Sequence, residues 1–397
     1  MTMKRDDASG DCVADLPGGL PAVAANDAPG QLAWPALREH LTRRHRSPVS
    51  IITLQKLGSS AQGEEALKQF SYGEPLLIEY AVGDQVVKEV IHRIRPTSFS
   101  RERSDDGAAS VWLDYATYNR LPRHINATDI LALLDSGELL SLKEPKELLL
   151  VTAYQPGALY ADDLMRLRDG GKVQPVDLQR AEVLASYLAA IHQRTLDDPS
   201  RQPALWRRRL RDLIGHGECI MGLTDNYPAD FVLADADRLR RIEELANRWR
   251  WRLKPRHHRL RQVHGDFHPF NILFSDDAEF HVLDRSRGEW GEPADDVSCM
   301  TINYIFFGLQ RTGDMSGPFR QLYDRFWQVY LANRDDPELL EAIQPWYAWR
   351  ALVVASPLWY PNISTAVRSK LLHFCEEVMA ADRFDYAHPE RYWPGGI

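Results

Sequence analysis

The side chains that could do chemistry gather in one short segment of the second half of the chain. It reads His264-Gly265-Asp266-Phe267-His268-Pro269-Phe270-Asn271, and two apolar runs around a polar turn then lead to Asp284. Two such runs predict a β-hairpin. Facing residues of a hairpin have a constant index sum, and the midpoint of Asn271 and Asp284 falls in the turn. We therefore expect these two side chains to lie side by side at the open end of the hairpin.

A carboxylate beside a carboxamide, with no sulfur nearby, predicts a site for Mg²⁺ rather than for zinc. Asp266 stands five residues before Asn271, on the loop that enters the hairpin. From there its carboxylate can orient a hydroxyl group beside the metal and accept its proton. Asp266, Asn271 and Asp284 together indicate a phosphoryl-transfer centre.

This segment resembles the catalytic signature of aminoglycoside phosphotransferases, choline kinases and their relatives, H-G-D-x-x-x-x-N followed by a hairpin and an Asp. These enzymes share the protein-kinase fold. The resemblance implies that Asp266 is the catalytic base, that Asn271 and Asp284 hold Mg²⁺, and that His264 shapes the loop. It implies ATP as the donor, with GTP as the alternative, and a small-molecule hydroxyl as the acceptor. It is strongest over residues 260–300 and extends from about 35 to 382.

Two positions in the predicted nucleotide-binding lobe differ from the residues that the family has there. Alignment of the strand at 87–95 puts Arg93 where the family has a lysine, and the following helix offers Asp114 as its inward acid. Because Arg is longer than Lys and Asp shorter than Glu, this pair could restore the usual span. The alternative is that Arg93 is an exposed charge and that Asp114 pairs elsewhere.

Three further segments match the order of the family's parts. Gly58-Ser59-Ser60-Ala61-Gln62-Gly63 is a candidate phosphate-covering loop, although a plain turn is the alternative. The stretch 151–157 resembles the hinge that binds adenine through the backbone, here of Ala153 and Gln155. Asp296 resembles the acid at a helix start that braces the catalytic loop, so we expect a structural role for it.

The surrounding pattern predicts an α+β, bilobal protein-kinase-like fold. Strands are expected at 50–57, 76–82, 85–95 and, buried, at 147–154, with a helix at 108–121. Further helices are expected at 177–192, 203–214, 233–252, 315–333, 336–354 and 364–382. We predict a disordered leader at 1–33, a nucleotide-binding lobe at 34–155, and a helical lobe with the catalytic loop and acceptor site at 156–397.

Composition narrows the class of protein. The 397 residues carry a formal net charge of −8, which does not favour non-specific nucleic-acid binding. Four cysteines without any CxxC pairing predict reduced thiols in a cytoplasmic chain. No run of 18 apolar residues occurs, so we expect no membrane span. Nothing in the sequence indicates an oligomeric state.

The acceptor has two opposed interpretations. Arginines crowd the approach to the catalytic loop, at 248–261, at 207–211, and at Arg285 and Arg287. They either form a solvated face or recognise an anionic acceptor. Glu289 and Trp290, with Trp251 and Trp359, would instead suit a cation or a sugar. Both interpretations stay open at this point.

Two other classes of protein compete with the phosphotransferase. Arg93 and the thin glycine loop suggest a catalytically weak or silent kinase-fold module that only binds nucleotide. His264 and His268 have the H-x-x-x-H spacing of a metal-dependent hydrolase. However, Gly265 and Pro269 disfavour a helix there, and no Glu follows His264 as the zinc-protease motif requires.

Overall fold

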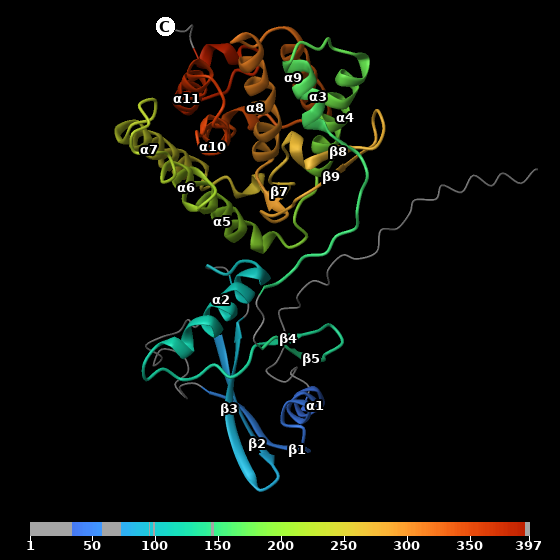
Figure 1. Ribbon diagram of the computed structural model, residues 1–397, viewed down its shortest axis with the longest axis vertical. Coiled ribbons are helices and arrows are strands. Elements are labelled where there is room, and N and C mark those ends of the chain that lie inside the picture. Colours follow the sequence, from blue (N-terminus) through green and yellow to red (C-terminus); the bar gives the residue numbers. More distant parts are fainter. Residues whose placement is uncertain (1–33, 58–72, 95, 98–99, 144–146, 394–397) are drawn as a thin grey trace, which may run out of the picture. The chain divides into compact units, whose positions relative to one another are not determined.

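The computed structural model of the chain describes residues 34–57, 73–94, 96–97, 100–143 and 147–393 (Figure 1). Its contacts divide the chain into two compact units. Unit 1 comprises Met1–Arg95 and Gly107–Leu148, and unit 2 comprises Pro96–Asp106 and Leu149–Ile397. Each unit has its own hydrophobic core. The predicted leader lies outside the described residues, and the predicted lobe boundaries stay predictions.

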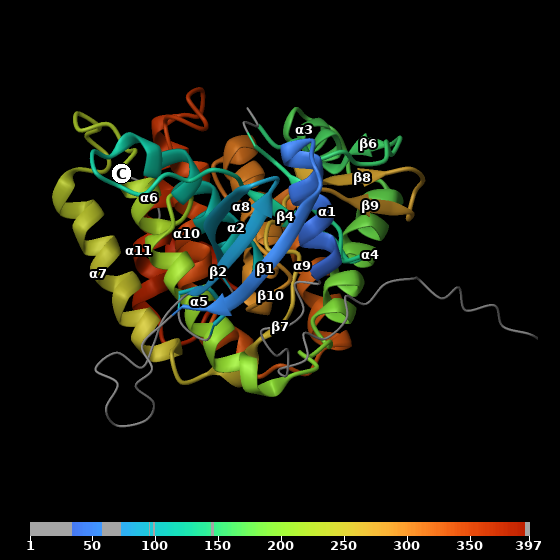
Figure 2. The ribbon, with the colours of Figure 1, turned by 90° about the horizontal axis from the view of Figure 1, so that it is seen from below.

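Unit 1 is built on a three-stranded antiparallel sheet of β1 (Val49–Lys56), β2 (Gly73–Val82) and β3 (Gln85–Ile94). The hairpin predicted between β2 and β3 is confirmed, and it turns at Gly83, whose φ of +58° favours glycine. Helix α1 (Trp34–His45) lies along β1 (Figure 2). Alternate residues of the strands, such as Leu76, Ile78 and Tyr80, are buried and form the core of the unit with α1.

The remaining elements of unit 1 are α2 (Ser104–Thr117), which unit 2 shares at its first turn, and the small hairpin of β4 (Leu131–Leu133) and β5 (Leu139–Ser141). The buried strand predicted at 147–154 is wrong. Residues 147–154 form no strand, and Leu150 and Val151 are exposed. An apolar run alone does not make a strand, because a strand also needs a neighbour with which its backbone can pair.

Unit 2 is mainly helical, which completes the predicted α+β class. Its helices are α3 (Tyr160–Arg168), α4 (Pro175–Ile191), α5 (Gln202–Gly215), α6 (Ile220–Thr224), α7 (Ala236–Leu253), α8 (Pro293–Thr312), α9 (Gly317–Asn333), α10 (Gln344–Ala355) and α11 (Thr365–Ala380). Ser364 caps α11, as expected, by accepting a hydrogen bond from the Val367 N–H. Helix α10 begins later than predicted, with Pro345 in its first turn, where a missing N–H costs nothing.

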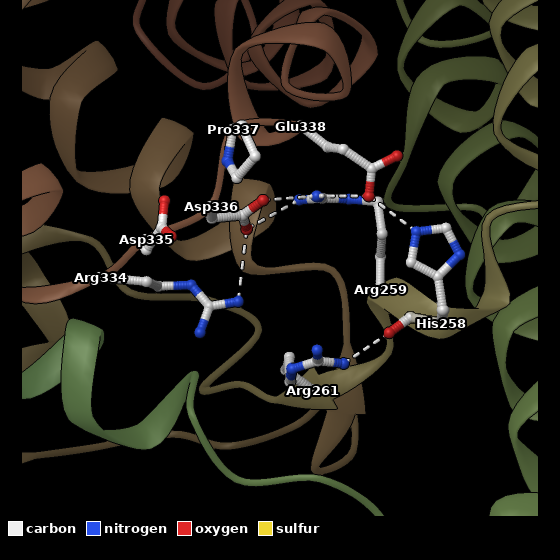
Figure 3. Close-up of a pocket in the computed structure, with 8 residues that line it drawn as sticks. All are labelled: His258, Arg259, Arg261, Arg334, Asp335, Asp336, Pro337 and Glu338. Atoms are coloured by element: carbon white, nitrogen blue, oxygen red, sulfur yellow. Dashed lines mark hydrogen bonds and ion pairs between the residues drawn. The ribbon is translucent and has the colours of Figure 1, made fainter.

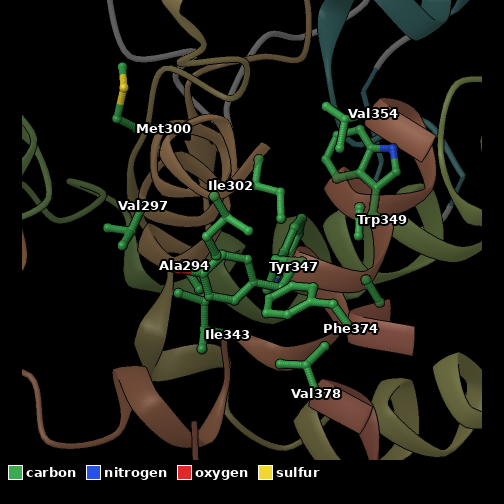
Figure 4. Close-up of a cluster of buried hydrophobic side chains, with 14 of the residues drawn as sticks. Ala294, Val297, Met300, Ile302, Ile343, Tyr347, Trp349, Val354, Phe374 and Val378 are labelled. Atoms are coloured by element: carbon green, nitrogen blue, oxygen red, sulfur yellow. The ribbon is translucent and has the colours of Figure 1, made fainter. Parts of the chain in front are cut away.

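Helix α8 runs through the core of unit 2, and every residue from Pro293 to Leu309 is buried. Figure 4 shows Ala294 of α8 in the same buried cluster as Tyr347 of α10 and Phe374 of α11. The sequence showed no helical period here because a helix buried on all sides has no polar stripe. The packing of α8 fixes its first turn, which carries Asp295 and Asp296, against the catalytic segment.

Two small sheets complete unit 2 and hold the predicted catalytic hairpin. One has the order β6 (Ala158–Leu159), β8 (Ile272–Phe274), β9 (Phe280–Val282), and the other pairs β7 (Arg261–Gln262) with β10 (Trp290–Gly291). All the pairings are antiparallel. None of the described helices combines the length and the apolar character that a bilayer-spanning segment needs.

Candidate active site

The loop that carries Asp266 is held from behind by a buried carboxylate. Asp296, in the first turn of α8, accepts the backbone N–H groups of His264 and Gly265, each at 2.7 Å. On its other side, the Nε2 atom of His192 lies 3.1 Å from the same carboxylate. Asp296 and both histidines are buried, and Gly265 has a φ of +88°. The backbone of the loop is therefore fixed by hydrogen bonds that water cannot reach, and Asp296 has the structural role expected of it.

The carboxylate of Asp266 is surrounded by basic groups. The Arg350 Nη1 atom lies 2.6 Å from Oδ1, while Arg287 Nη2 and His268 Nε2 each lie 3.7 Å from Oδ2. The Asp266 side chain is 13% exposed, so it is still open to a small group from solvent. One oxygen of the Asp266 carboxylate is thus hydrogen-bonded to Arg350, while part of the side chain remains accessible to a substrate.

These neighbours set the protonation state of Asp266. Burial alone would raise its pKa, but the charges of Arg350, Arg287 and His268 and the hydrogen bond from Arg350 outweigh it, so the pKa lies below its usual value. The carboxylate is consequently ionised at neutral pH. An ionised carboxylate accepts hydrogen bonds only, which suits the binding of a hydroxyl group.

Arg350 is a functional candidate that the sequence analysis missed. Its guanidinium contacts the Asp266 side chain, the Gly265 carbonyl oxygen at 3.0 Å, and Asp295 at 2.7 Å. Arg209 pairs with the other oxygen of Asp295, and the Trp349 ring lies 3.7 Å from the Arg350 guanidinium carbon. The one available signal was a single charge within the otherwise uncharged and largely apolar α10, because buried charges are rare unless they are paired.

Asn271 and Asp284 flank the open end of the hairpin, but their predicted register is wrong by one residue. Ile272 faces Val282, and Leu283 donates its N–H to the Asn271 carbonyl oxygen at 2.8 Å. Leu283 therefore lies opposite Asn271, and Asp284 follows it. The turn explains the shift, because the Ser275 N–H bonds to the Glu279 carbonyl oxygen and closes the hairpin around Asp277.

The two side chains nevertheless offer hard oxygen donors near the loop. Asn271 uses Nδ2 to hold the Asp266 carbonyl oxygen at 3.1 Å, and within the described residues no donor contacts its Oδ1 atom. Asp284 is exposed, and its φ of +51° is a conformation that few residues other than glycine and Asn or Asp adopt. No hydrogen bond or ion pair reaches its carboxylate from the described part of the chain. This donor set fits Mg²⁺, although that role stays a prediction.

The structure describes four of the six predicted nucleotide-side residues. Arg93 on β3 and Asp114 on α2 are both half-buried, and within the described residues no hydrogen bond or ion pair joins them. Gly58 and Ser59 lie outside the described residues. Ala153 is exposed and Gln155 half-buried, in a segment without regular secondary structure. The roles of all six therefore stay predictions.

Several arginines of the predicted basic cluster form ion pairs with acidic residues of unit 2. Arg259 pairs with Glu292 and with Asp336, and Arg252 pairs with Asp382. Figure 3 shows Arg259 and Asp336 beside a pocket of about 190 Å³ that holds none of the predicted site residues. Of the arginines that the sequence put forward, Arg287 is one that does contact Asp266. Arg259 is buried, so it fits neither the solvated face nor the anion site, and its ion pairs hold the fold instead. Arg252 lies in a partly exposed ion pair, as the solvated interpretation expects.

The histidines do not form the arrangement that a zinc hydrolase requires. His264 lies in the loop, where its Nδ1 atom is 3.3 Å from the Asp266 nitrogen, and His268 caps the 3₁₀ turn Pro269–Asn271. The two rings are therefore not on one helix face.

The comparisons with known proteins identify the family of the chain. The sequence model of the phosphotransferase enzyme family matches residues 89–348, which is more than half of the chain. A search of curated proteins finds no match.

Solved structures with partial similarity include kinases of several kinds. An ethanolamine kinase of Plasmodium vivax has 15% identity and a TM-score of 0.34, with 80% of this chain and 77% of that chain covered. Amicoumacin kinase has 13% identity and a TM-score of 0.39, with 88% and 96% covered. A spectinomycin phosphotransferase has 12% identity and a TM-score of 0.33, with 87% and 97% covered.

These likenesses have TM-scores below 0.5 and add nothing to the family match. The match begins at Glu89 within β3 and includes the catalytic loop. The match confirms the predicted family and its protein-kinase-like fold. The chain belongs to the phosphotransferase enzyme family.

Proposed function

We propose that the protein transfers the γ-phosphoryl group of ATP to a hydroxyl group of a small molecule, with Mg²⁺ as the cofactor. The observation that carries the proposal is the Asp266 carboxylate. It is ionised, partly accessible, clamped by Arg350, and located on a loop that Asp296 braces. GTP is the alternative donor.

Asp266 would orient the acceptor hydroxyl and accept its proton. A carboxylate with a lowered pKa is a weak base, but phosphoryl transfer asks mostly for positioning, because the transition state is loose and the proton leaves late. The rigid support of Asp266 matters more than its basicity under this mechanism. His264, which is buried beneath the loop, would shape the backbone rather than touch the substrate.

Asn271 and Asp284 would hold the Mg²⁺ ion, which supplies positive charge to the transferring phosphoryl group when it is bound. Arg93, with Asp114, would position the nucleotide phosphates. Gly58 and Ser59 would cover them, and the backbone of Ala153 and Gln155 would bind the base.

The test combines binding and turnover. We expect Mg-ATP to raise the melting temperature of the protein, and we expect ADP release in the presence of a panel of hydroxyl compounds. Asp266→Ala should abolish ADP release above the blank while the Mg-ATP thermal shift survives. Full turnover by Asp266→Ala would contradict the proposal.

A silent nucleotide-binding module is the second candidate, and it is favoured by the absence of an ion pair between Arg93 and Asp114 within the described residues. It predicts the Mg-ATP thermal shift without ADP release above the blank for any acceptor. Retention of Asp266, Asn271 and Asp284 argues against it, because binding alone does not require a proton acceptor.

A further inference from the structure

The charged side chains beside Asp266 also indicate which charge the acceptor carries. Its closest charged partners are the guanidinium groups of Arg350 and Arg287. His268 lies equally near, but burial lowers the pKa of its ring, so it adds a neutral imidazole rather than a charge at neutral pH. The nearby acids Asp295 and Asp296 are already used. Asp295 is held between Arg350 and Arg209, and Asp296 holds backbone N–H groups and His192. The remaining acid near the loop, Asp284, is the proposed Mg²⁺ ligand. The charged groups left beside the place where an acceptor hydroxyl would bind are therefore the two guanidinium groups.

The two arginines differ in how far they are already engaged. Arg350 donates to two carboxylates and a carbonyl oxygen, and its side chain is 7% exposed. Arg287 is 15% exposed and makes one close side-chain contact, from Nη1 to Glu218 at 2.7 Å. Its Nη2 atom lies 3.7 Å from Asp266, which is an ion pair but too long for a hydrogen bond. Arg287 therefore has donor capacity left, and Arg350 has little.

Contacts with neighbouring side chains hold Arg287 in place. The Trp349 ring lies 5.0 Å from its guanidinium carbon, and the Arg103 Nη1 atom binds its carbonyl oxygen at 3.2 Å. Gly288, the next residue, has a φ of +83°, and a Cβ there would come within 2.7 Å of Arg103. The guanidinium is thus presented by a backbone that is itself held in place, as recognition of a defined group requires.

Arg287 lies close enough to Asp266 to contact a bound acceptor. A hydroxyl that reacts must come within about 2.6–3.2 Å of the Asp266 carboxylate. Since Arg287 lies 3.7 Å from that same carboxylate, a substituent next to the hydroxyl falls within its reach. A guanidinium binds carboxylate and phosphate oxygens through paired N–H groups, and it repels an ammonium group.

We propose that the acceptor carries an anionic group, a carboxylate or a phosphate, next to the hydroxyl that is phosphorylated, and that Arg287 binds this group. The inference rests on the proposed phosphotransferase function. It separates this protein from kinases whose acceptors are cationic. Glu218 pairs with Arg287 and therefore competes with the acceptor for it. Because the Glu218 side chain is 63% exposed, it can move into solvent when the anionic group binds.

The experiment compares four related probes: sorbitol, gluconate, glucose 6-phosphate and glucosamine. Binding of each probe is measured by calorimetry with a non-hydrolysable Mg-ATP analogue present, and ADP release is measured with Mg-ATP. We expect gluconate or glucose 6-phosphate to bind at least about tenfold more tightly than sorbitol, and glucosamine to bind no better than sorbitol. The two anionic probes distinguish a carboxylate from a phosphate.

Variants assign the effect to Arg287. Arg287→Gln should remove the preference for the anionic probe, and Arg287→Lys, which keeps the charge but loses the paired donors, should retain part of it. Glu218→Gln should strengthen anion binding by freeing the guanidinium. Arg285→Gln is the matched control two residues away. Its side chain binds the Val263 carbonyl oxygen, and the ratio of anionic to cationic probe affinity should not change.

Two results would overturn the inference. One is tighter binding of glucosamine than of gluconate and glucose 6-phosphate, and the other is equal binding of all four probes. In both cases a Mg-ATP thermal shift with ADP release would leave the phosphotransferase function standing. If Mg-ATP itself gives neither a shift nor ADP release, the proposed function fails and the inference fails with it.

Discussion

Arg350 donates to Asp266 at 2.6 Å from a helix that lies 84 residues further along the chain. The same guanidinium holds the carbonyl oxygen of Gly265 and one oxygen of Asp295. One buried side chain thus orients the proposed catalytic carboxylate, supports the backbone beside it, and connects both to the first turn of α8. The predictions below follow from this arrangement.

Arg350→Met should lower turnover of Mg-ATP by tens of fold to about 100-fold, because Asp266 loses the group that orients it. The pKa of Asp266 should rise, since burial, which raises the pKa, is no longer opposed by the charge of Arg350. If the rate requires ionised Asp266, it should begin to fall at a higher pH in the variant than in the parent protein as the solution is made more acidic. The measurement is the pH–rate profile of ADP release.

The controls separate a positioning role from a loss of fold. Arg350→Lys should recover part of the rate and move the acid limb back towards that of the parent. Arg240→Met, on an exposed face of α7, should change neither. An acid limb of Arg350→Met that coincides with that of the parent would contradict the tuning role, provided that both proteins are folded.

Asp296→Asn should destabilise the protein by about 2–4 kcal/mol, because one buried charge accepts two backbone N–H groups and contacts His192. An amide cannot accept all of these contacts at once. Denaturant unfolding of the two proteins measures the difference. Asp237→Asn at an exposed ion pair should cost less than about 1 kcal/mol, and an equal effect of the two changes would argue against the brace.

Asp336 should contribute to stability in a pH-dependent way. Burial raises its pKa, but the hydrogen bonds and charges of Arg259 and Arg334 outweigh it, so the folded-state pKa is below its usual value. The contribution is therefore complete above the unfolded pKa of about 3.9 and is lost as the pH falls through the lower, folded pKa. Asp336→Asn should lower the melting temperature at pH 7, and it should lower it by less at pH 2.

The neighbouring Asp335 is the matched control, because it is exposed beside the same pocket (Figure 3). Asp335→Asn should leave the melting curve nearly unchanged at both pH values. A destabilisation by Asp336→Asn that is as large at pH 2 as at pH 7 would show that its ion pairs are not responsible.

Asp284→Asn should weaken the apparent affinity for Mg²⁺ and leave nucleotide binding without the metal largely intact. The expected loss is at least about tenfold, because an ionised oxygen ligand is replaced by a neutral one. ADP release is titrated with Mg²⁺ at a fixed ATP concentration. Asp276→Asn, in the exposed turn of the same hairpin, should not shift the midpoint. An unchanged midpoint in Asp284→Asn would remove Asp284 from the metal site.

Local sequence patterns were sufficient for elements that neighbouring residues specify. The β2–β3 hairpin follows from two strand-like runs joined by the turn signal Gly83-Asp84, and the start of α11 follows from its cap at Ser364. The register of the β8–β9 hairpin was not predictable in the same way. It depends on how the turn around Asp277 closes, and a change of one residue there moves every facing pair.

The sequence by itself determined the family-like order of Asp266, Asn271 and Asp284, because this spacing is carried by one continuous loop and hairpin. Only the tertiary structure decided what surrounds Asp266. Arg350 comes from α10, Asp296 from the buried start of α8, and their contacts with the loop are set by helix packing across long stretches of chain. Such contacts leave no periodic pattern in the sequence. Each of them involves a single residue of a helix, and the pattern of the other residues in that helix reflects packing in the hydrophobic core.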